Sequence, residues 1–250
     1  MKIAVAGGTG TVGRHVVRIA RERGHEVVSL SRGEGVDLVK GKGLNEALQK
    51  VDVAIDVSGI RDLSTKKNVD FFTTGTQNLL AAEKKAGVKH HVLLSTVGIE
   101  KAPSSIYAGK RAQEEAVIHG DVPWTILRST QFHEFVPMTL GYTSAGPLAM
   151  VPRMLLQPVA AAEVAEALVD AAEAGPRGRL TDMGGPGKEL LANLARAYVR
   201  KTGRRKLVVQ VPAPGPVGKA MRKGYLLPGP AAAVGRQTFD QWLDATAAKR

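Results

Sequence analysis

The chain opens with KIAVAGGTGTVGR, residues 2–14, in which a short apolar run stops at a glycine cluster and a helical pattern begins at once. Gly7, Gly10 and Gly13 have the spacing G-x-x-G-x-x-G. Glycine permits a positive φ in the turn, and its missing Cβ lets the backbone approach a pyrophosphate and lets the helix lie close to the strand. The first N–H groups of that helix are free to bind an anion. The segment predicts a dinucleotide-binding turn, with a purely structural glycine turn as the alternative.

The composition is typical of one globular domain. Of 250 residues, 44% are hydrophobic, and no low-complexity tract interrupts them. No apolar run approaches the roughly 18 residues that span a bilayer, and the first strand runs directly into the glycine turn, so we expect neither a membrane span nor a signal peptide. The absence of cysteine excludes disulfides, thiol catalysis and cysteine-ligated metals, and it favours a cytoplasmic location.

The formal net charge is +12, and the excess is uneven: residues 196–236 contain ten Lys or Arg and no acid. Such a segment can attract nucleic acid, an anionic lipid surface or an acidic substrate, and the alternative is a solvated basic face. Aromatic residues make up only 4% of the chain, which leaves little for a base-stacking platform. We therefore expect a small-molecule substrate, with no nucleic-acid or membrane partner. Monomer and homodimer both stay open.

Apolar runs alternate with helical patterns along the chain. Strands are expected at 3–6, 26–31, 36–39 (small), 51–57, 91–94, 124–127, 155–159, 179–181 and 207–211. Helices are expected after the glycine turn and at 44–50, 68–86, 106–118, 132–140, 161–174 and 188–201. This order predicts an α/β fold of the Rossmann type, with a doubly wound parallel sheet. The chain 1–250 reads as a single domain. Its part from about residue 132 contributes the substrate pocket, and Pro- and Gly-rich loops at 212–218 and 227–235 form a small cap.

The end of the second strand bears on the choice of nucleotide. An acid there would bind the ribose 2′-hydroxyl, but the strand ends in Ser31-Arg32 and no acid follows before Glu34. Arg32 offers a donor fork that suits phosphate, and Arg14 in the first helical turn can join it. These residues favour NADP(H) over NAD(H), and the alternative is two solvated arginines. Asp37 is expected near the adenine.

Other candidate site residues follow from the same geometry, because open α/β sheets bind ligands beyond the carboxyl ends of their strands. Ser95 and Thr96 are candidates for ligand binding, and the alternative is that they form a simple turn or a helix cap. Phe132 is a candidate for the substrate pocket, and the alternative is that it packs in the core. The pyrophosphate is expected on Gly7, Thr9, Gly10, Thr11, Val12, Gly13 and Arg14, and the rest of the cofactor on Ser31, Arg32, Asp37, Ser58, Gly59, Ser95, Lys110 and Thr130. The substrate pocket is expected at Gln131, Phe132 and His133.

Several of these motifs occur together in one known group of proteins. The glycine turn, Ser31-Arg32, LSTVG at 94–98, Gly109-Lys110 with Glu114, and WTILRSTQF at 124–132 resemble the atypical short-chain dehydrogenase/reductases. The nearest branch is the NAD(P)H-binding, NmrA-like group, to which QPV at 157–159 and TFDQWL at 238–243 are also similar. The resemblance covers nearly the whole chain, and its N-terminal half is the more specific.

The resemblance implies a set of catalytic roles. Redox members of the superfamily use a Tyr and a Lys four residues apart on one helix, with a Ser or Thr after the preceding strand; the Lys holds the nicotinamide ribose and the Tyr moves the substrate proton. Lys110 matches, and Thr96 or Ser95 matches the hydroxyl, but Ile106 stands at the tyrosine position. Tyr107 lies about 100° further round the helix. Three alternatives stay open for Tyr107: a local adjustment of the helix brings it to the site, it only packs or binds ligand, or it is exposed. For Lys110 the alternative to ribose binding is a plain surface lysine.

Other chemistries find little support in the sequence. His90 and His91 are adjacent on a strand, so their side chains point to opposite faces, and no histidine spacing indicates a metal site. Glu114 and Glu115 are expected on a helix surface, and no nucleophile elbow is present. We therefore expect an NADP(H)-dependent oxidoreductase acting on a small carbonyl, imine or polarised double bond, with Tyr107, Lys110 and Thr96 as catalytic residues. The alternative is a non-catalytic, NADP(H)-binding redox sensor that regulates a protein partner.

Overall fold

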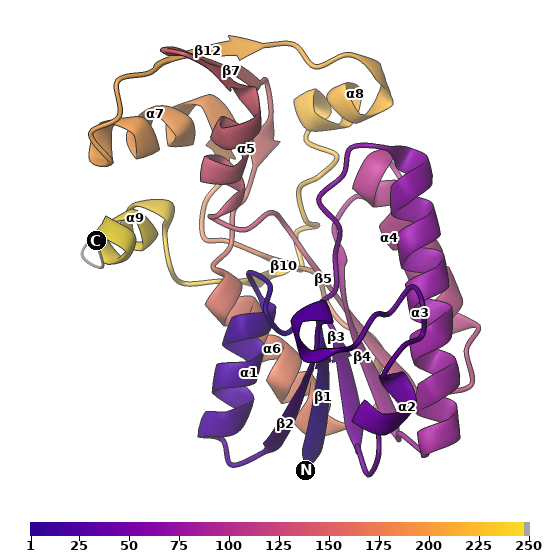
Figure 1. The fold of residues 1–250 in the computed structure, drawn as a ribbon. Coiled ribbons are helices and arrows are strands. Elements are labelled where there is room, and N and C mark those ends of the chain that lie inside the picture. The colour runs from indigo at the N-terminus through magenta and orange to yellow at the C-terminus, as the bar shows by residue number, and fades with distance from the viewer. Residues whose placement is uncertain (248–250) are drawn as a thin grey trace.

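A computed structural model describes residues 1–247 and places a parallel sheet between two layers of helices, with a smaller cap at one end of the strands (Figure 1). The sheet contains β1 (Lys2–Ala6), β2 (Glu26–Leu30), β3 (Val53–Asp56), β4 (His90–Thr96), β5 (Trp124–Ser129), β9 (Gly178–Arg179), β10 (Met183–Gly184) and β13 (Ala233–Val234). Flanking it are α1 (Gly13–Glu22), α2 (Leu44–Ala47), α3 (Thr65–Ala86), α4 (Ser105–Ile118) and α6 (Ala161–Ala174), with a 3-10 turn η1 (Arg32–Glu34) after β2.

The strand order is β13-β10-β5-β4-β3-β1-β2, with β9 paired to β5. Every pairing within this sheet is parallel; in β1, for example, Ile3 lies opposite Val27 of β2 and Val53 of β3. Because successive units are added on opposite sides of β1, the sheet has its topological switch point between β1 and β3, where such folds bind ligands. The expected Rossmann-type, doubly wound fold is confirmed.

The central strands are buried along nearly their whole length because helices cover both faces of the sheet. Ile3 and Val5 of β1 point toward α1 and α6, where they pack with Val16 and Val164 in one buried cluster. Ala4 and Ala6 point toward the opposite face and pack against α2 and α3. This two-sided burial fixes the register of β1, and with it the position of the glycine turn that follows.

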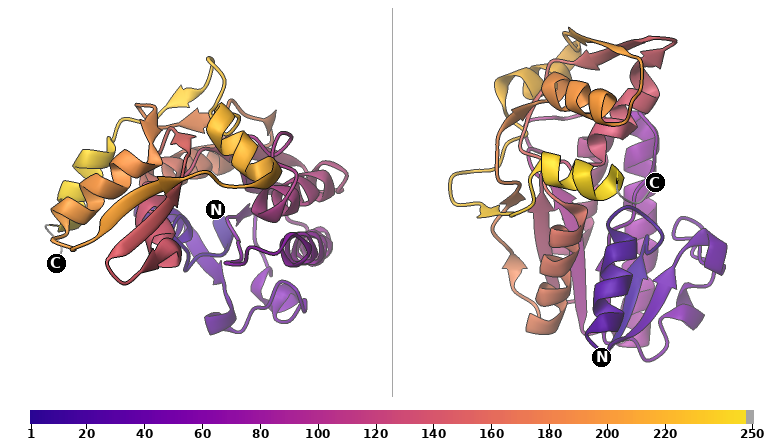
Figure 2. Two further views of the ribbon diagram at one scale, coloured as in Figure 1. Left: turned by 90° about the horizontal axis from the view of Figure 1, so that it is seen from above. Right: turned by 90° about the vertical axis from the view of Figure 1, so that its left-hand side faces the viewer.

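The cap stands over the carboxyl ends of the strands (Figures 1 and 2). It contains a second sheet of β6 (Ser144–Ala145), β7 (Leu148–Pro152) and β12 (Leu207–Val211), the pair β8 (Leu155–Leu156) and β11 (Glu189–Leu190), and helices α5 (Phe135–Thr143), α7 (Leu191–Lys201), α8 (Gly215–Lys223) and α9 (Phe239–Ala247). A single buried cluster joins α5, α7, β7 and β12 and includes Tyr107 of α4. The cap is therefore packed onto the larger part through α4.

Two expectations about local structure are wrong. Residues 36–39 form no strand: η1 comes first, and Asp37 and Lys42 then make one isolated antiparallel bridge. Gly35 and Gly43 have φ of +83° and +75°, so the backbone turns too often for a strand to form.

The second wrong expectation is the loop at 212–218, of which the part from Gly215 onward begins α8. Pro216 is tolerated there because the first turn of a helix needs no N–H donor from that position. The sequence also gave no indication of β7, and the helix expected at 188–201 begins only at Leu191, after β11.

No helix within residues 1–247 combines the length and apolarity required to cross a membrane.

Candidate functional site

The turn between β1 and α1 has no room for side chains at its key positions. Gly7 has a φ of +80°, and a Cβ on it would lie 2.8 Å from the Cα of Ser58. A Cβ on Gly13 would collide with the carbonyl oxygen of Gly7. The Gly10 N–H donates to that same oxygen at 2.9 Å. The glycines therefore bring the start of α1 against the ends of β1 and β3, as the spacing predicts.

This turn presents unused backbone donors. Among residues 1–247, the N–H groups of Thr9, Thr11 and Val12 have no hydrogen-bond acceptor, and Thr9 and Gly10 are exposed. They lie at the N-terminus of α1, where the helix dipole favours an anion. A row of free N–H groups on glycine-shaped backbone fits a pyrophosphate.

The end of β2 carries groups of both charges. The Arg32 side chain is exposed, and within residues 1–247 it makes no ion pair. The Ser31 hydroxyl donates to Oε2 of Glu34 at 3.3 Å, so η1 brings this acid back to the strand end. Asp37 Oδ1 accepts the Lys40 N–H at 3.1 Å within its own turn. The structure thus places one arginine and one carboxylate next to Ser31.

A buried chain of hydrogen bonds connects β3 with α4. Asp56, only 1% exposed, accepts the Ser58 N–H on Oδ1 and the Gln113 side-chain N–H on Oδ2, both at 2.8 Å. Gln113 Oε1 in turn accepts Lys110 Nζ at 2.8 Å. Asp56 and Gln113 therefore fix the loop after β3 and the position of the lysine together.

Lys110 is buried beneath the strand ends, so the alternative of a plain surface lysine is wrong. Its Nζ donates to the Leu94 carbonyl at 2.8 Å, lies 3.5 Å from the Ser58 carbonyl and stands 4.6 Å from the ring centre of Phe72. Burial lowers the pKa of Lys110 to about 8, although the nearby Asp56 carboxylate opposes that shift. The 3.5 Å contact between Lys110 Nζ and the Ser58 carbonyl is the longer of the two to backbone carbonyls, and Ser58 is one of the residues at which the cofactor is expected.

Tyr107 does not occupy the position of the usual catalytic tyrosine. That position holds Ile106, which is 38% exposed, whereas Tyr107 is 8% exposed and belongs to the cap core. Burial raises the pKa of Tyr107 to about 12, and an interaction with the Gln131 side chain opposes the shift. The Gln131 amide makes no well-formed hydrogen bond within residues 1–247. The alternative of an exposed tyrosine is excluded, while packing and ligand binding both stay open.

The hydroxyl groups at the ends of β4 and β5 differ in how they are used. Ser95 Oγ is buried and has no partner among the described residues. Thr96 Oγ1 makes a long hydrogen bond of 3.4 Å to the Ser129 carbonyl, and Thr130 Oγ1 makes a short one of 2.6 Å to the Gln157 carbonyl. Among these three hydroxyl groups, Ser95 Oγ is thus the one whose hydrogen-bonding capacity is unused.

Phe132 and His133 take part in packing. Phe132 packs against the core of the main sheet, which was the alternative for this residue. The His133 ring is fully buried; its Nε2 lies 3.1 Å from the Gln237 carbonyl oxygen, and its centroid is 5.7 Å from that of Phe239 and 5.8 Å from that of Trp242. His133 therefore anchors α9 to the end of β5.

The expectation that Glu114 lies on a helix surface is wrong. Its side chain is 2% exposed, and the carboxylate binds Arg128 through two hydrogen bonds of 2.7 Å and Arg179 at 2.9 Å. The face of α4 that carries Glu114 packs on β5, which supplies Arg128. Glu115 is exposed, as expected, and pairs with Arg111 at 3.0 Å.

Three residues of this region escaped the sequence analysis. Asp56 is a single polar residue at the end of an apolar strand, and Gln113 lies one helical turn after Lys110, so both carried a weak signal. Glu134 carried none: it is the N-cap of α5, and burial raises the pKa of its carboxyl, which lies 4.0 Å from Arg14. A carboxyl group so close to the glycine turn is a tertiary feature.

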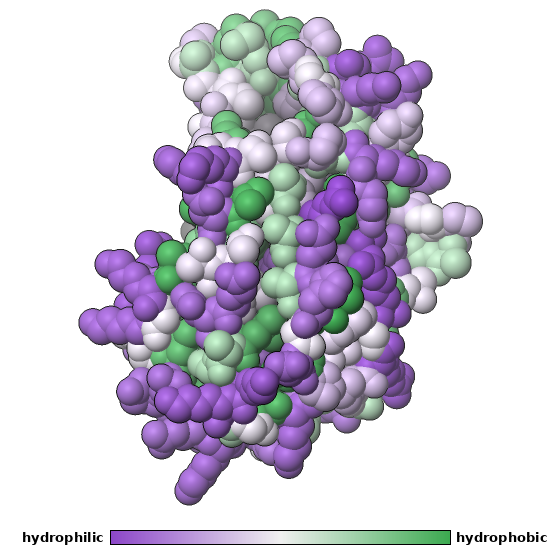
Figure 3. All heavy atoms as spheres, turned by 90° about the vertical axis from the view of Figure 1, so that its right-hand side faces the viewer, coloured by the Kyte–Doolittle hydropathy of each residue, from purple (hydrophilic) through white to green (hydrophobic). Residues whose placement is uncertain are grey.

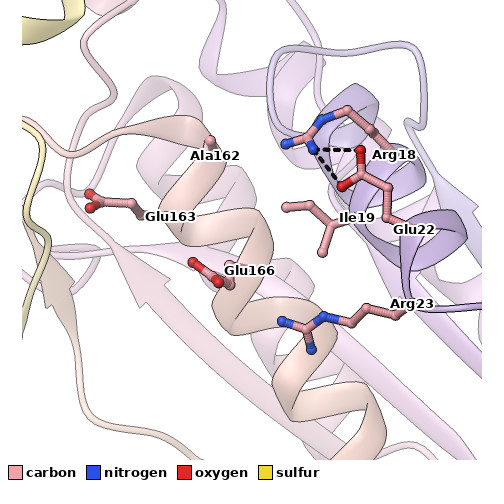
Figure 4. Close-up of a pocket in the computed structure, with 7 residues that line it drawn as sticks. All are labelled: Arg18, Ile19, Glu22, Arg23, Ala162, Glu163 and Glu166. Atoms are coloured by element: carbon pink, nitrogen blue, oxygen red, sulfur yellow. Dashed lines mark hydrogen bonds and ion pairs between the residues drawn. The ribbon is translucent and has the colours of Figure 1, made fainter.

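A surface hollow of about 320 Å³ lies elsewhere, between α1 and α6 (Figure 4). It is lined by Arg18, Ile19, Glu22, Arg23, Ala162, Glu163 and Glu166. These side chains sit on the flank of the sheet rather than at the strand ends, and Arg18 and Glu22 pair with each other. Within the described chain, no group of His, Asp and Glu is arranged to hold a metal ion.

A family model described as NAD(P)H-binding matches residues 7–174. A Streptomyces griseus (4-alkanoyl-5-oxo-2,5-dihydrofuran-3-yl)methyl phosphate reductase is 31% identical over 223 residues, covering 79% of this chain and 74% of that protein. The photosystem II assembly factor Ycf39 of Synechocystis is 33% identical over 149 residues, covering 53% of this chain and 45% of that protein. The chain thus spans about half the length of the assembly factor.

Solved structures show the same fold at low identity. A dTDP-4-dehydrorhamnose reductase of Clostridium acetobutylicum has a TM-score of 0.79 at 16% identity, covering 100% of this chain and 99% of that one. The Escherichia coli NADPH-dependent quinone oxidoreductase, complexed with NADPH, has a TM-score of 0.72 at 16% identity, covering 98% of this chain and 99% of that one. Related folds also hold NAD.

Proposed function

The chain belongs to the NAD(P)H-binding family of atypical short-chain dehydrogenase/reductases, and from that premise we propose that it is an NADP(H)-dependent oxidoreductase. The observation that carries the proposal is the row of free N–H groups on the glycine turn. The substrate would be a small organic molecule with a carbonyl, an imine or a polarised double bond. The bound nicotinamide would supply or accept the hydride.

The preference for NADP(H) rests on Arg32 and Arg14. Arg32 is an exposed, unpaired guanidinium at the end of β2, where it would bind the 2′-phosphate with Arg14. Glu34 opposes this assignment, because its carboxylate lies beside Ser31. A carboxylate there suits a ribose hydroxyl and repels a phosphate. The choice of cofactor therefore depends on which side chain contacts the adenosine ribose: Arg32 would select NADP(H), and Glu34 would select NAD(H).

Lys110 and the groups around it would form the reacting part of the site. Lys110 would hold the nicotinamide ribose on the side of its long 3.5 Å contact with Ser58. Ser95, Thr96 and Gln131 would orient the substrate, since Ser95 and Gln131 have buried polar atoms without partners. Tyr107 stays protonated at neutral pH because its pKa is about 12, so it would donate rather than accept a hydrogen bond.

We also propose that the chain acts as one domain in the cytoplasm, in which residues from about 132 onward supply the substrate pocket. The shared core of α4 and the cap supports this arrangement. Residues 248–250 lie outside the described part of the chain.

The second candidate function is a non-catalytic NADP(H) sensor, and a specific observation favours it. Ile106 occupies the tyrosine position, and Tyr107 packs in the cap core. The Lys110 ammonium also has protein acceptors already. A site built this way binds the cofactor without an evident proton donor in the usual place.

Titration with NADPH and NADH tests the proposal. We expect NADPH to bind more tightly, and Arg32→Ala to weaken NADPH by about 10- to 100-fold, the value of one hydrogen bond to a charged group, with NADH unchanged. Arg21→Ala, an exposed arginine at the far end of α1, is the control. Tighter binding of NADH would overturn the cofactor assignment. Turnover of NADPH with quinones, enones and ketones separates enzyme from sensor, and Tyr107→Phe with unchanged turnover would remove Tyr107 from the reaction.

A further inference from the structure

The cap sheet has an unusual outer face. On β7 and β12 the side chains of Ala149, Val151 and Val208 point inward and are buried. The alternate positions are also apolar and lie in register: Leu148 opposite Leu207, Met150 opposite Val209 and Pro152 opposite Val211. We call these six residues the outer cap face.

The outer cap face is open to solvent. Leu207 is 67% exposed, Met150 46% and Val209 38%. The helices α5 and α7 lie beneath the sheet, so the opposite face looks away from the rest of the molecule (Figures 1 and 2). Figure 3 shows hydrophobic side chains at this end of the protein, above flanks that are mostly hydrophilic. Leu148, Pro152 and Val211 are half-buried, so the exposed apolar surface is centred on Met150, Leu207 and Val209.

Most of the net charge belongs to the cap. Residues 135–156 and 189–247 contain 11 Lys or Arg against 3 acids, Glu189, Asp240 and Asp244, whereas the rest of the chain has 24 Lys or Arg against 20 acids. The cap is therefore more cationic than the larger part of the molecule, and no acid lies between residues 190 and 239.

Several of these cations lie at the ends of the cap strands, although Arg204 stands over the ring of the buried Tyr198 in α7. Arg204, Arg205 and Lys206 come directly before Leu207, and Arg153 directly follows Pro152. Lys206 Nζ donates to the Gly146 carbonyl at 2.9 Å, which places its charge at the edge of the sheet. Further along, α8 carries Lys219, Arg222 and Lys223. An apolar stripe with positive charge at both ends is the result.

From this arrangement we infer that the outer cap face docks on the anionic surface of a lipid bilayer. Its aliphatic side chains enter the boundary between headgroups and acyl chains, while the surrounding Lys and Arg bind anionic headgroups. The contact is peripheral, since no described helix spans a membrane. This inference replaces the expectation of no membrane partner, and it does not depend on the proposed catalytic function.

Charge complementarity distinguishes the bilayer from other occupants. A second copy of the chain would bring the same cations against each other across a two-fold axis, which is repulsive. A protein interface is rich in aromatic side chains, and the outer cap face has none. Nucleic acid would gain nothing from a stripe of Leu, Met, Pro and Val.

Flotation of the full chain with vesicles tests this inference. We expect binding to phosphatidylcholine vesicles that contain about 30% phosphatidylglycerol, and little binding to phosphatidylcholine alone. Binding should weaken as salt rises from about 0.1 M to about 0.5 M. Failure to bind the anionic vesicles would overturn the inference, as would tighter binding to a nucleic-acid duplex in the same buffer.

Two variants locate the contact. The triple charge reversal of Arg204, Arg205 and Lys206 to Glu should reduce vesicle binding more than about tenfold. The matched control reverses Arg21, Lys50 and Lys85, which are exposed at the opposite end of the molecule, and should leave binding within about twofold.

The double variant Leu207→Thr with Val209→Thr keeps strand-forming residues and should weaken binding severalfold without changing its salt dependence. An equal loss of binding in the control triple variant, or unchanged binding in both cap variants, would overturn the assignment to this face. Each variant's circular dichroism spectrum should match that of the parent chain.

Discussion

The two sheets of this protein meet their surroundings differently. In the main sheet, β3 is buried at every position and β1 at all but its first residue, because helices cover both faces. In the cap sheet, β7 buries Ala149 and Val151, β12 buries only Val208, and both strands leave an apolar face exposed. The comparison shows that burial on two faces gives continuous apolar runs that are easy to recognise, whereas burial on one face normally gives alternation with polar residues. The cap sheet lacks those polar residues, and this absence points to a function for its outer cap face.

The covered region should tolerate change least at Gly13. In Gly13→Ala the added Cβ collides with the Gly7 carbonyl oxygen, so α1 must move away from β1. We expect a loss of several kcal/mol of unfolding free energy and no measurable NADPH binding. Denaturant titration and cofactor titration measure the two effects. Gly141→Ala in α5, where the new Cβ meets nothing within 4 Å, is the control and should not destabilise the fold.

The buried carboxylate of Glu114 gives the next largest effect. Glu114→Gln leaves Arg128 with Glu100 as its one remaining carboxylate partner, at 2.7 Å, and Arg179 facing a neutral group. We expect a loss of roughly 3 kcal/mol of unfolding free energy. Glu115→Gln removes an exposed pair with Arg111 and should change that free energy by less than about 0.5 kcal/mol. Equal losses in the two variants, measured by urea denaturation, would contradict the burial of Glu114.

Two neighbouring residues of β12, the inward Val208 and the outward Leu207, directly test the difference between the covered and the exposed face of the cap sheet. Val208→Thr places a hydroxyl inside the cap core and should cost about 2 kcal/mol of unfolding free energy. Leu207→Thr alters a side chain that is already 67% exposed, so the unfolding free energy should change by less than about 0.5 kcal/mol. A large loss in Leu207→Thr would mean that the outer cap face is covered in the folded protein.

The amino end of β4 should make stability depend on pH. Burial lowers the pKa of His90 to about 4 from an ordinary 6.5, and Nε2 lies 2.8 Å from the Thr125 hydroxyl. Between these values the unfolded chain binds the extra proton, so this contribution to stability is present above pH 6.5 and is lost as the pH falls toward 4.

His90→Asn should remove roughly 2 kcal/mol of the pH dependence of the unfolding free energy in this range. Thermal unfolding at pH 7 and at pH 4.5 measures the difference between the two proteins. Parallel pH profiles would show that His90 does not titrate as its burial implies.

Local chemistry explains why parts of the site were predictable. Gly7, Gly10 and Gly13 form the turn that their spacing predicts: a Cβ on Gly7 or Gly13 would collide with backbone, and one on Gly10 would lie 3.1 Å from the Gly7 carbonyl oxygen. Lys110 was found by its position in a motif. Gln113 was not, because its role depends on Asp56, which is 57 residues away in the sequence. The burial of Glu114 depends in the same way on Arg128 and Arg179.

The sequence by itself determined the parallel main sheet, the alternation of its central strands with helices and the nucleotide-binding turn, because these follow from apolar periodicity and from the backbone freedom of glycine. Only the tertiary structure decided that Lys110 is held by Asp56 and Gln113, that Tyr107 is enclosed by the cap, and that six apolar residues of β7 and β12 share one exposed face. Such contacts join segments far apart in the chain. Their energy depends on which groups the fold brings together and removes from water, and a single stretch of sequence does not contain that information.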